Sequence, residues 1–207
     1  MYMRKIVLVF ICSLFSLNYA FSQWYLGVKA ASNWSNVINY PYNLENSSYK
    51  NGFKLGLITN YQINTLFGIQ GELLYSREGF KEKDIIYNYE ESYDMNVNSN
   101  NINFPVVVKC YPFRNGLNLH SGFMIQYCFS EFIKYNKVKE YKKPFGHKNN
   151  LDFGILLGLG FNYKRCLDFD LRYCWGLINS YKSIKGMNKR TIEFSVGYLF
   201  EIGRAHV

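Results

Sequence analysis

The chain has 207 residues, a formal net charge of +9 and 19% aromatic side chains. After residue 22, no stretch reaches the roughly 18 consecutive apolar residues of a membrane-spanning helix, so the composition argues against a helical membrane protein. The length fits one domain, and the aromatic content favours β-structure over a helical enzyme.

Residues 1–22 have the organisation of a cleaved signal peptide. A basic pair at residues 4–5 precedes an apolar core at residues 6–17, and small residues then lead to an expected cleavage site before Gln23. A membrane anchor is the competing interpretation, but the apolar core is shorter than the roughly 20 residues of a spanning helix. For an exported chain, anionic lipid head groups rather than nucleic acid are the expected counterpart of the positive charge.

The mature chain alternates between large apolar and polar or small side chains in eight segments. In the sixth segment, for example, Ile155 and Leu157 share one face, whereas Gly154 and Gly158 belong to the opposite face. A soluble sandwich or lipocalin-like barrel would need mixed side-chain sizes on a closed apolar face. Charge collects on one face only, and charge is costly in hydrocarbon, so this face should point into a barrel while the apolar face meets lipid. The expected strands are residues 24–31, 53–61, 67–76, 103–110, 117–129, 151–162, 167–177 and 191–200.

The connections between these segments alternate in length. The short ones are residues 63–65, 114–116 and 164–165, and the long ones are about 35–51, 80–98, 131–150 and 179–188. Asn115-Gly116 is a strong signal for a tight turn. Together these patterns predict an all-β fold, an eight-stranded antiparallel up-and-down transmembrane β-barrel over residues 23–201, with short periplasmic turns and long extracellular loops.

Charged residues on the inward face should fill the barrel. An eight-stranded barrel is just wide enough for side chains to fill it, and buried charges are tolerated when they are paired. Opposite charges on neighbouring strands are expected to meet, which predicts a plug of ion pairs rather than an open pore. The expected neighbours are Lys54 with Glu72, Glu72 with Lys109, Arg172 with Glu193, and Glu193 with Lys29. The whole expected network is Lys29, Lys54, Glu72, Lys109, Asp168, Asp170, Arg172 and Glu193.

Residues suited to catalysis have competing interpretations. Asp168 and Asp170 suggest acid–base chemistry, but the nearby cations favour structural ion pairs. A lipid A-modifying enzyme would need a nucleophile or base near the extracellular rim. His120 should instead point inward near the periplasmic end, Ser121 should point outward, and His147 lies in the third long connection without an identifiable partner. We therefore expect no catalytic residues, no cofactor and no metal site.

The third long connection is rich in lysine. It is a candidate anionic-lipid-binding loop for the phosphates of lipopolysaccharide, because each Lys near an anionic surface contributes about 1 kcal/mol. A solvated loop that keeps the rim soluble explains the same composition, and both interpretations stay open. The lysines are Lys134, Lys137, Lys139, Lys142, Lys143 and Lys148.

Seven short motifs follow one another along the mature chain. They are GVKAASN from Gly27, GFKLGL from Gly52, GIQGELLYSREGFK from Gly68, INFPVVVKCYPF from Ile102, GLNLHSGFMIQY from Gly116, GLGFNYK from Gly158 and LDFDLRYCWGLINS from Leu167. As a series they resemble the PorT-like outer-membrane β-barrel family of Bacteroidetes-type bacteria. The resemblance implies a place in the cell envelope and a link to type IX secretion, and it supplies no catalytic motif.

Residues 202–207 break the alternation, and they match what a common sequencing-adapter sequence would encode. We interpret them as a non-native tail, which leaves Phe200 close to the terminal aromatic that barrel-assembly machinery recognises in similar proteins. Three functions remain open at this point. They are a structural or interaction barrel with an envelope or secretion partner, a narrow channel, and a lipid A-modifying enzyme.

Overall fold

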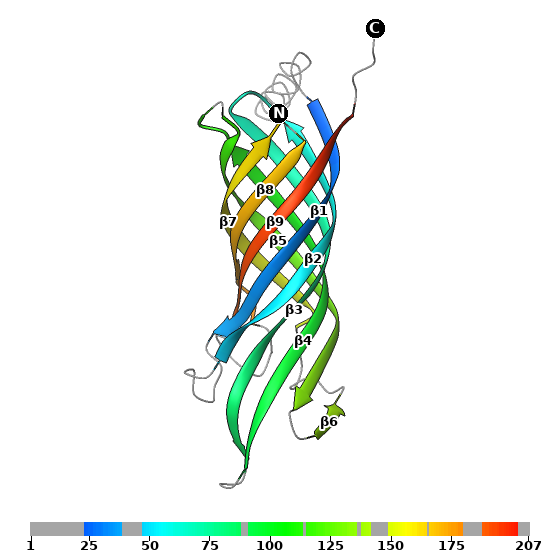
Figure 1. Cartoon of the computed structure of the whole chain (residues 1–207), viewed down its shortest axis with the longest axis vertical. Helices are drawn as coiled ribbons and strands as arrows, with labels where there is room; N and C mark the ends of the chain where they lie inside the picture. Colours follow the sequence, from blue (N-terminus) through cyan, green and yellow to red (C-terminus); the bar gives the residue numbers. More distant parts are fainter. Residues whose placement is uncertain are drawn as a thin grey trace, which may run out of the picture.

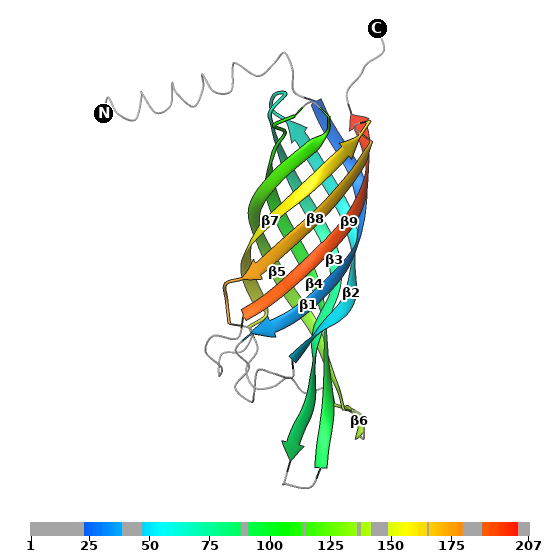
Figure 2. The same cartoon turned by 60° about the vertical axis from the view of Figure 1, so that its left-hand side comes forward.

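The computed structural model describes residues 23–38, 47–87, 91–113, 115–135, 138–141, 149–164, 166–179 and 188–202. Their strands wind into a tilted barrel, with one short strand outside it (Figures 1 and 2). The strands are β1 (Gln23–Ile38), β2 (Ser47–Gln62), β3 (Phe67–Tyr87), β4 (Glu91–Cys110), β5 (Leu117–Tyr135), β6 (Val138–Tyr141), β7 (Leu151–Tyr163), β8 (Leu167–Gly176) and β9 (Asn188–Ile202). Within this described part of the chain, no helix is long and apolar enough to cross a membrane.

Eight of these strands close into a ring. Their order is β4, β3, β2, β1, β9, β8, β7 and β5, and a further pairing between β4 and β5 completes the circle. Every neighbouring pair is antiparallel, including the seam between β1 and β9. β6 pairs with β5 beyond the ring. The prediction of a closed, eight-stranded antiparallel barrel is therefore confirmed.

The pairing register sets the tilt of the strands. A path of paired residues that leaves β1 at Tyr25 and crosses each strand in turn returns to β1 at Ser35, ten residues further on. A slip of ten residues, each rising ~3.3 Å, around eight strands that are ~4.8 Å apart tilts the strands by about 40°. Eight strands at this tilt enclose a space that side chains fill.

Neighbouring residues on each strand face opposite sides of the wall. On β7, Leu156 is 2% exposed whereas Leu157 is 62% exposed. Large apolar side chains of all eight barrel strands are exposed on the outside, and amide and charged side chains are buried on the inside. A continuous apolar outer surface of this kind suits lipid rather than water.

Three short connections lie at one end of the barrel, which we call the short-turn rim. They cover residues 63–66, 111–116 and 164–166, and β1 begins and β9 ends at this rim (Figure 1). In the first turn, Asn64 Oδ1 accepts hydrogen bonds from the backbone N–H groups of Leu66 and Phe67, each at 2.8 Å. In the second, Gly116 has a φ of +91°, which favours glycine.

The opposite end, the long-loop rim, differs from the sequence-based expectation. The prediction of a loop over residues 80–98 is wrong, because β3 runs on to Tyr87 and β4 starts at Glu91 as one paired hairpin. This hairpin projects well beyond the barrel (Figure 2). β5 continues beside it and pairs with β4 as far as Met95. Backbone pairing continues there although the outward face is no longer apolar, while Met95 and Val97 stay buried on the inward face.

Both predicted terminal segments fall largely outside the described residues. Residues 1–22, the predicted signal peptide, and residues 203–207 of the predicted tail are not among them. β1 begins at Gln23, the residue after the predicted cleavage site. Ile202 is the last residue of β9 and pairs with Trp24.

Candidate functional site

Within the part of the chain that the structure describes, ion pairs inside the barrel join ten charged side chains, five cations and five anions. They reach the interior because side chains two residues apart on a strand share a face. We divide them into two groups. The Asp170 cluster contains Lys29, Glu72, Lys109, Asp168, Asp170 and Arg172, and the Glu193 cluster contains Lys54, Glu78, Lys189 and Glu193.

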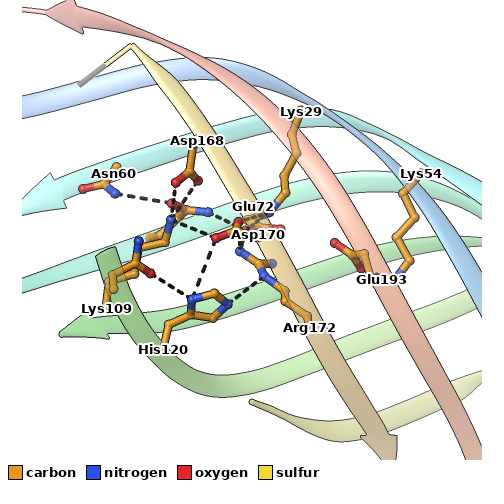
Figure 3. A network of polar contacts seen from close by, with 12 residues as sticks. Lys29, Lys54, Asn60, Glu72, Lys109, His120, Asp168, Asp170, Arg172 and Glu193 are labelled. Atoms are coloured by element: carbon orange, nitrogen blue, oxygen red, sulfur yellow. Dashed lines mark hydrogen bonds and ion pairs between the residues drawn. The ribbon is translucent and has the colours of Figure 1, made fainter. Parts of the chain in front are cut away.

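The Asp170 cluster lies nearer the short-turn rim and is built around two carboxylates (Figure 3). Lys29 Nζ lies 3.0 Å from Glu72 Oε1 and 2.8 Å from Asp170 Oδ2. Arg172 Nη2 lies 2.7 Å and 2.8 Å from the same two oxygens. Two cations from β1 and β8 thus share two carboxylates from β3 and β8, which ties together strands on opposite sides of the ring.

Lys109 is the third cation of this cluster, and His120 lies beside it. Lys109 Nζ lies 2.7 Å from Asp168 Oδ2 and 3.4 Å from Asp170 Oδ1. Arg172 Nε donates a hydrogen bond to His120 Nε2 at 3.2 Å. A guanidinium has no acceptor, so His120 Nε2 must be unprotonated and Nδ1 carries the hydrogen that faces Asn118 Oδ1 at 3.0 Å. The imidazole is therefore neutral in this arrangement.

The Glu193 cluster lies nearer the long-loop rim. Lys54 Nζ is 2.8 Å from Glu193 Oε2 and 3.2 Å from Glu78 Oε1. Lys189 also pairs with Glu78. Gln126 bridges this second pair, because its Nε2 donates to Glu78 Oε2 at 2.9 Å and its Oε1 accepts from Lys189 Nζ at 3.0 Å. The cluster contains two cations and two anions, so it is balanced in charge.

Glycines on β7 leave room for the Asp170 cluster. A Cβ atom on Gly158 would lie 2.4 Å from His120 Nε2 and 2.6 Å from the backbone oxygen of Leu171. A Cβ atom on Gly160 would lie 2.6 Å from Asp170 Oδ1. The small residues that the alternation placed on the inward face of this strand therefore have a steric reason. Apolar inward residues pack around the charges in two groups, one of Tyr25, Ile58 and Leu199 and one of Val107, Met124, Leu156 and Cys174.

The structure places all eight network residues expected from the sequence inside the barrel, each at most 6% exposed. The pairs differ from those expected, since Lys54 contacts Glu78 and Glu193, and Arg172 contacts Glu72 and Asp170. The expected pairs were taken from neighbouring strands alone, and this approach does not consider how far a long side chain reaches across the barrel interior.

Two members, Glu78 and Lys189, were missed by the sequence analysis. Each lies two residues past the end of an expected strand, Ser76 in one case and Thr191 in the other, and continues the same inward face. The alternation of inward and outward residues does extend to Glu78 and Lys189. The expected strands stopped earlier because the outward residues there are no longer apolar.

The residues considered for catalysis do not converge. Asp168 and Asp170 are engaged by cations, and His120 and Ser121 point to opposite sides of the wall, the first 4% exposed and the second outward. His147 lies outside the described residues. Among the residues that the structure describes, no group of three His, Cys, Asp or Glu side chains is arranged to hold a metal ion.

Of the candidate lipid-binding lysines, Lys134 is described and is exposed near the end of β5. Lys139 lies in β6, but its side chain is outside the described part, as are residues 137, 142, 143 and 148. Lys134 has basic neighbours that the sequence analysis did not single out. Lys81 and Lys134 flank Asn96 across three adjacent strands. Lys81, Lys134 and Arg77 all repel Lys50 electrostatically, and we call the four together the basic patch.

Comparisons with known proteins agree with this architecture. A sequence model of the outer membrane protein beta-barrel domain matches residues 17–182. The fold is similar to that of Neisserial surface protein A, at 13% identity and a TM-score of 0.54, over 86% of this chain and 97% of that one. It is also similar to Ail, the attachment invasion locus protein of Yersinia pestis, solved in complex with the heparin analogue sucrose octasulfate, at 17% identity and a TM-score of 0.50, over 86% and 99% of the two chains. Identities this low show a shared fold alone. No curated protein matches the chain.

Proposed function

Because the chain belongs to the family of outer membrane protein β-barrel domains and lies in the bacterial outer membrane, we propose that it is a non-enzymatic interaction barrel whose long-loop rim binds phosphate- or sulfate-bearing saccharides. In barrels of this class the short turns face the periplasm and the long connections face outward. The rim that carries the basic patch is then the one that meets the outer leaflet and the cell's surroundings.

The basic patch is the observation that carries this proposal. Arg77, Lys81 and Lys134 are exposed on the outside of β3 and β5, where these strands leave the apolar band. Aromatic side chains lie beside it on the outer surface, with Tyr49 48% exposed and Phe53 46% exposed. Cations directly beyond an aromatic belt are placed at the depth of lipid head groups, where each contributes about 1 kcal/mol toward an anionic surface.

The filled interior favours an interaction role over a channel or an enzyme. Lys29 and Lys109 are 1% and 0% exposed, and each lies in ion pairs with anions from other strands. Interlocked side chains of this kind leave no wide path along the barrel axis. The solved complex of Ail with a sulfated ligand gives a precedent for anionic saccharides on a barrel of this fold.

Binding to two anionic probes would test the proposal and identify the source of the anion. The refolded barrel in phosphatidylcholine nanodiscs would be titrated with a fluorescent heparin oligosaccharide, and lipid A would be incorporated into the nanodisc in a second series. The double variant Arg77→Glu with Lys81→Glu should weaken binding at least tenfold, and added salt should weaken it further. The matched control is Lys164→Glu, which reverses an exposed lysine on the short-turn rim.

Binding of heparin alone would assign the patch to an external ligand, and binding of lipid A alone would assign it to the membrane. The proposal would be contradicted if neither probe bound. It would also be contradicted if the double variant and the Lys164→Glu control lost the same amount of binding affinity.

A link to protein secretion is a finer form of the same interaction role. It is supported by the motif series that resembles PorT-like barrels, from Gly27 to Leu167. Deleting the gene and comparing secreted proteins by mass spectrometry would test this link. An unchanged set of secreted proteins would remove secretion from the proposal and leave the anion-binding role to be judged by the titrations.

A further inference from the structure

A small pocket opens inside the barrel at the long-loop rim, above the Glu193 cluster. Its volume is about 60 Å³, and its lining comes from β1, β3, β4, β5, β7 and β9 together with the residues just before β7 and just after β8. This pocket is separate from the basic patch, which lies on the outside of the wall. We propose that it binds a single neutral sugar ring.

The lining is dominated by carboxamides. Six of its sixteen side chains are amides, namely Asn36, Asn101, Gln126, Asn149, Asn150 and Asn179. An amide offers a donor and an acceptor side by side, which matches the paired donor and acceptor character of sugar hydroxyl groups. Asn101 Nδ2 donates to Ser76 and Ser99 at 3.3–3.4 Å, distances at the long end of the hydrogen-bond range, so a ligand hydroxyl can replace these contacts.

Part of the pocket lining is apolar. Val37, Phe80 and Val97 are at most 5% exposed and line the pocket between the amides. A sugar ring presents C–H groups on its faces and hydroxyl groups on its edge. A lining that combines apolar and amide side chains suits both kinds of group.

The charges at the pocket are already engaged. Lys189, which lines it, is paired with Glu78 and donates to Gln126. Asp152 Oδ1 accepts a hydrogen bond from the backbone N–H of Ile178 at 3.3 Å, and Glu131 has a partner of its own. Among the described lining residues, the cation is already paired, which disfavours an anionic ligand, and both carboxylates have partners, so the amides are left to bind uncharged hydroxyl groups.

The size of the pocket limits the ligand to one ring. A cavity of about 60 Å³ holds roughly four to six water molecules, because each needs about 10–15 Å³ of such space. This is the space that one monosaccharide fills, and it is far smaller than the pockets that hold drug-sized ligands. A terminal sugar of a longer glycan would fit with the rest of its chain directed outward.

Side-chain amide NMR signals would test the proposal directly. The full barrel, labelled with ¹⁵N at Asn and Gln and held in phosphatidylcholine nanodiscs, would be titrated with glucose, galactose and N-acetylglucosamine. Glucose 6-phosphate and glucosamine would be the anionic and cationic comparisons. We expect saturable shifts of the Asn101 and Gln126 amide signals with at least one neutral sugar, in the millimolar range, and at least fivefold weaker effects with the charged sugars.

Two pocket variants and one control separate binding at this site from binding elsewhere. Val37→Phe should fill the pocket and Asn101→Leu should remove its central amide, so that each abolishes the remaining shifts. Val108→Phe places the same ring on the lipid face, and it should leave sugar binding unchanged because Val108 is 47% exposed on the outside. If Val37→Phe does not fold, Asn101→Leu still decides.

Absent shifts with all three neutral sugars would overturn the proposal, as would stronger binding of a charged sugar or equal shifts in the pocket variants. The heparin and lipid A titrations of the basic patch are unaffected by any of these outcomes.

Discussion

Asp170 is the residue on which the interior charges converge. Its Oδ2 atom lies 2.8 Å from both Lys29 Nζ and Arg172 Nη2, and its Oδ1 atom lies 3.4 Å from Lys109 Nζ. Three cations around one carboxylate would repel one another if Glu72 and Asp168 did not share them. The cluster is stable as a balanced set, so the loss of any one member leaves a buried charge without compensation.

We predict that Lys109→Met and Asp168→Leu each lower the free energy of unfolding by about 3–5 kcal/mol, because each leaves a buried charge without its closest counter-ion. Combining Lys109→Met with Asp168→Leu should cost less than the sum of the two single changes, since both charges are then removed. Urea unfolding in lipid vesicles, followed by tryptophan fluorescence, measures this. Additive losses would contradict a direct Lys109–Asp168 interaction.

At the residue scale, the membership of the network was easier to predict than its pairs. Inward orientation follows from a period of two along each strand, which is why Lys29 and Asp170 could be placed inside from the sequence. Partner choice depends on how long side chains cross the barrel. Lys29 reaches Glu72, which lies two strands away on β3, and strand adjacency carries no information about such a contact.

At the element scale, the inward residues of β7 match the size of the side chains that they face. It carries glycine where the Asp170 cluster approaches the wall, and Leu156 where the apolar group around Val107 does. Glycine lowers strand propensity, so these positions are explained by the space that neighbouring side chains need rather than by the strand itself.

We predict that Gly158→Ala destabilises the barrel by about 1–3 kcal/mol, because the new methyl group would press on His120 and on the backbone of Leu171. Gly71→Ala is the matched control on β3, since its added Cβ would meet Thr59 at an ordinary 3.4 Å. Heat-dependent migration in SDS gels and urea unfolding would report both variants. Equal stability of the two would show that the Asp170 cluster adapts freely.

The β3–β4 hairpin shows where side-chain alternation no longer predicts strands. Inside the membrane, alternation identifies strands because lipid and the barrel interior demand different side chains. Residues 80–98 lack a regular alternation of apolar and polar side chains, so a loop was predicted there, whereas the backbone continues the antiparallel ladder from Lys81 opposite Asn96 to Tyr87 opposite Glu91, with one register shift after Glu82. Pairing there depends on hydrogen bonds in register, for which side-chain polarity gives no signal.

We predict that the barrel folds without the outer part of this hairpin. Replacing residues 83–93 by an Asn-Gly turn removes strand that lies beyond the ring while keeping every barrel pairing. The shortened protein should keep its heat-dependent gel migration and β-sheet circular dichroism within error of the full chain. Failure to refold would mean that the hairpin helps to form the barrel.

At the scale of the whole molecule, the barrel encloses two charge-balanced clusters. Its two clusters have no net charge, and one lies nearer each rim, so an ion entering from either rim meets paired side chains. Figure 3 shows Lys54 and Glu193 beside the Asp170 cluster. The apolar groups around Ile58 and Leu156 fill space beside them. The closed ring of strands and the side chains that fill it together form a rigid support for the long-loop rim.

We predict that the purified barrel produces no conductance steps in planar lipid bilayers. A porin of known conductance, inserted under the same conditions, is the positive control. Reproducible steps that persist after repurification would contradict the ion-pair plug and restore the narrow channel as the better function.

The seam between β1 and β9 has a consequence for how the chain is made. Leu26 pairs with Phe200 there, so the ring closes between strands at opposite ends of the described chain. Until β9 has been synthesised and exported, β1 has an unsatisfied edge, which hydrocarbon does not tolerate. Strands therefore cannot insert into the membrane one at a time during translation. A chain truncated before β9 could not close the ring, and we expect it to be degraded.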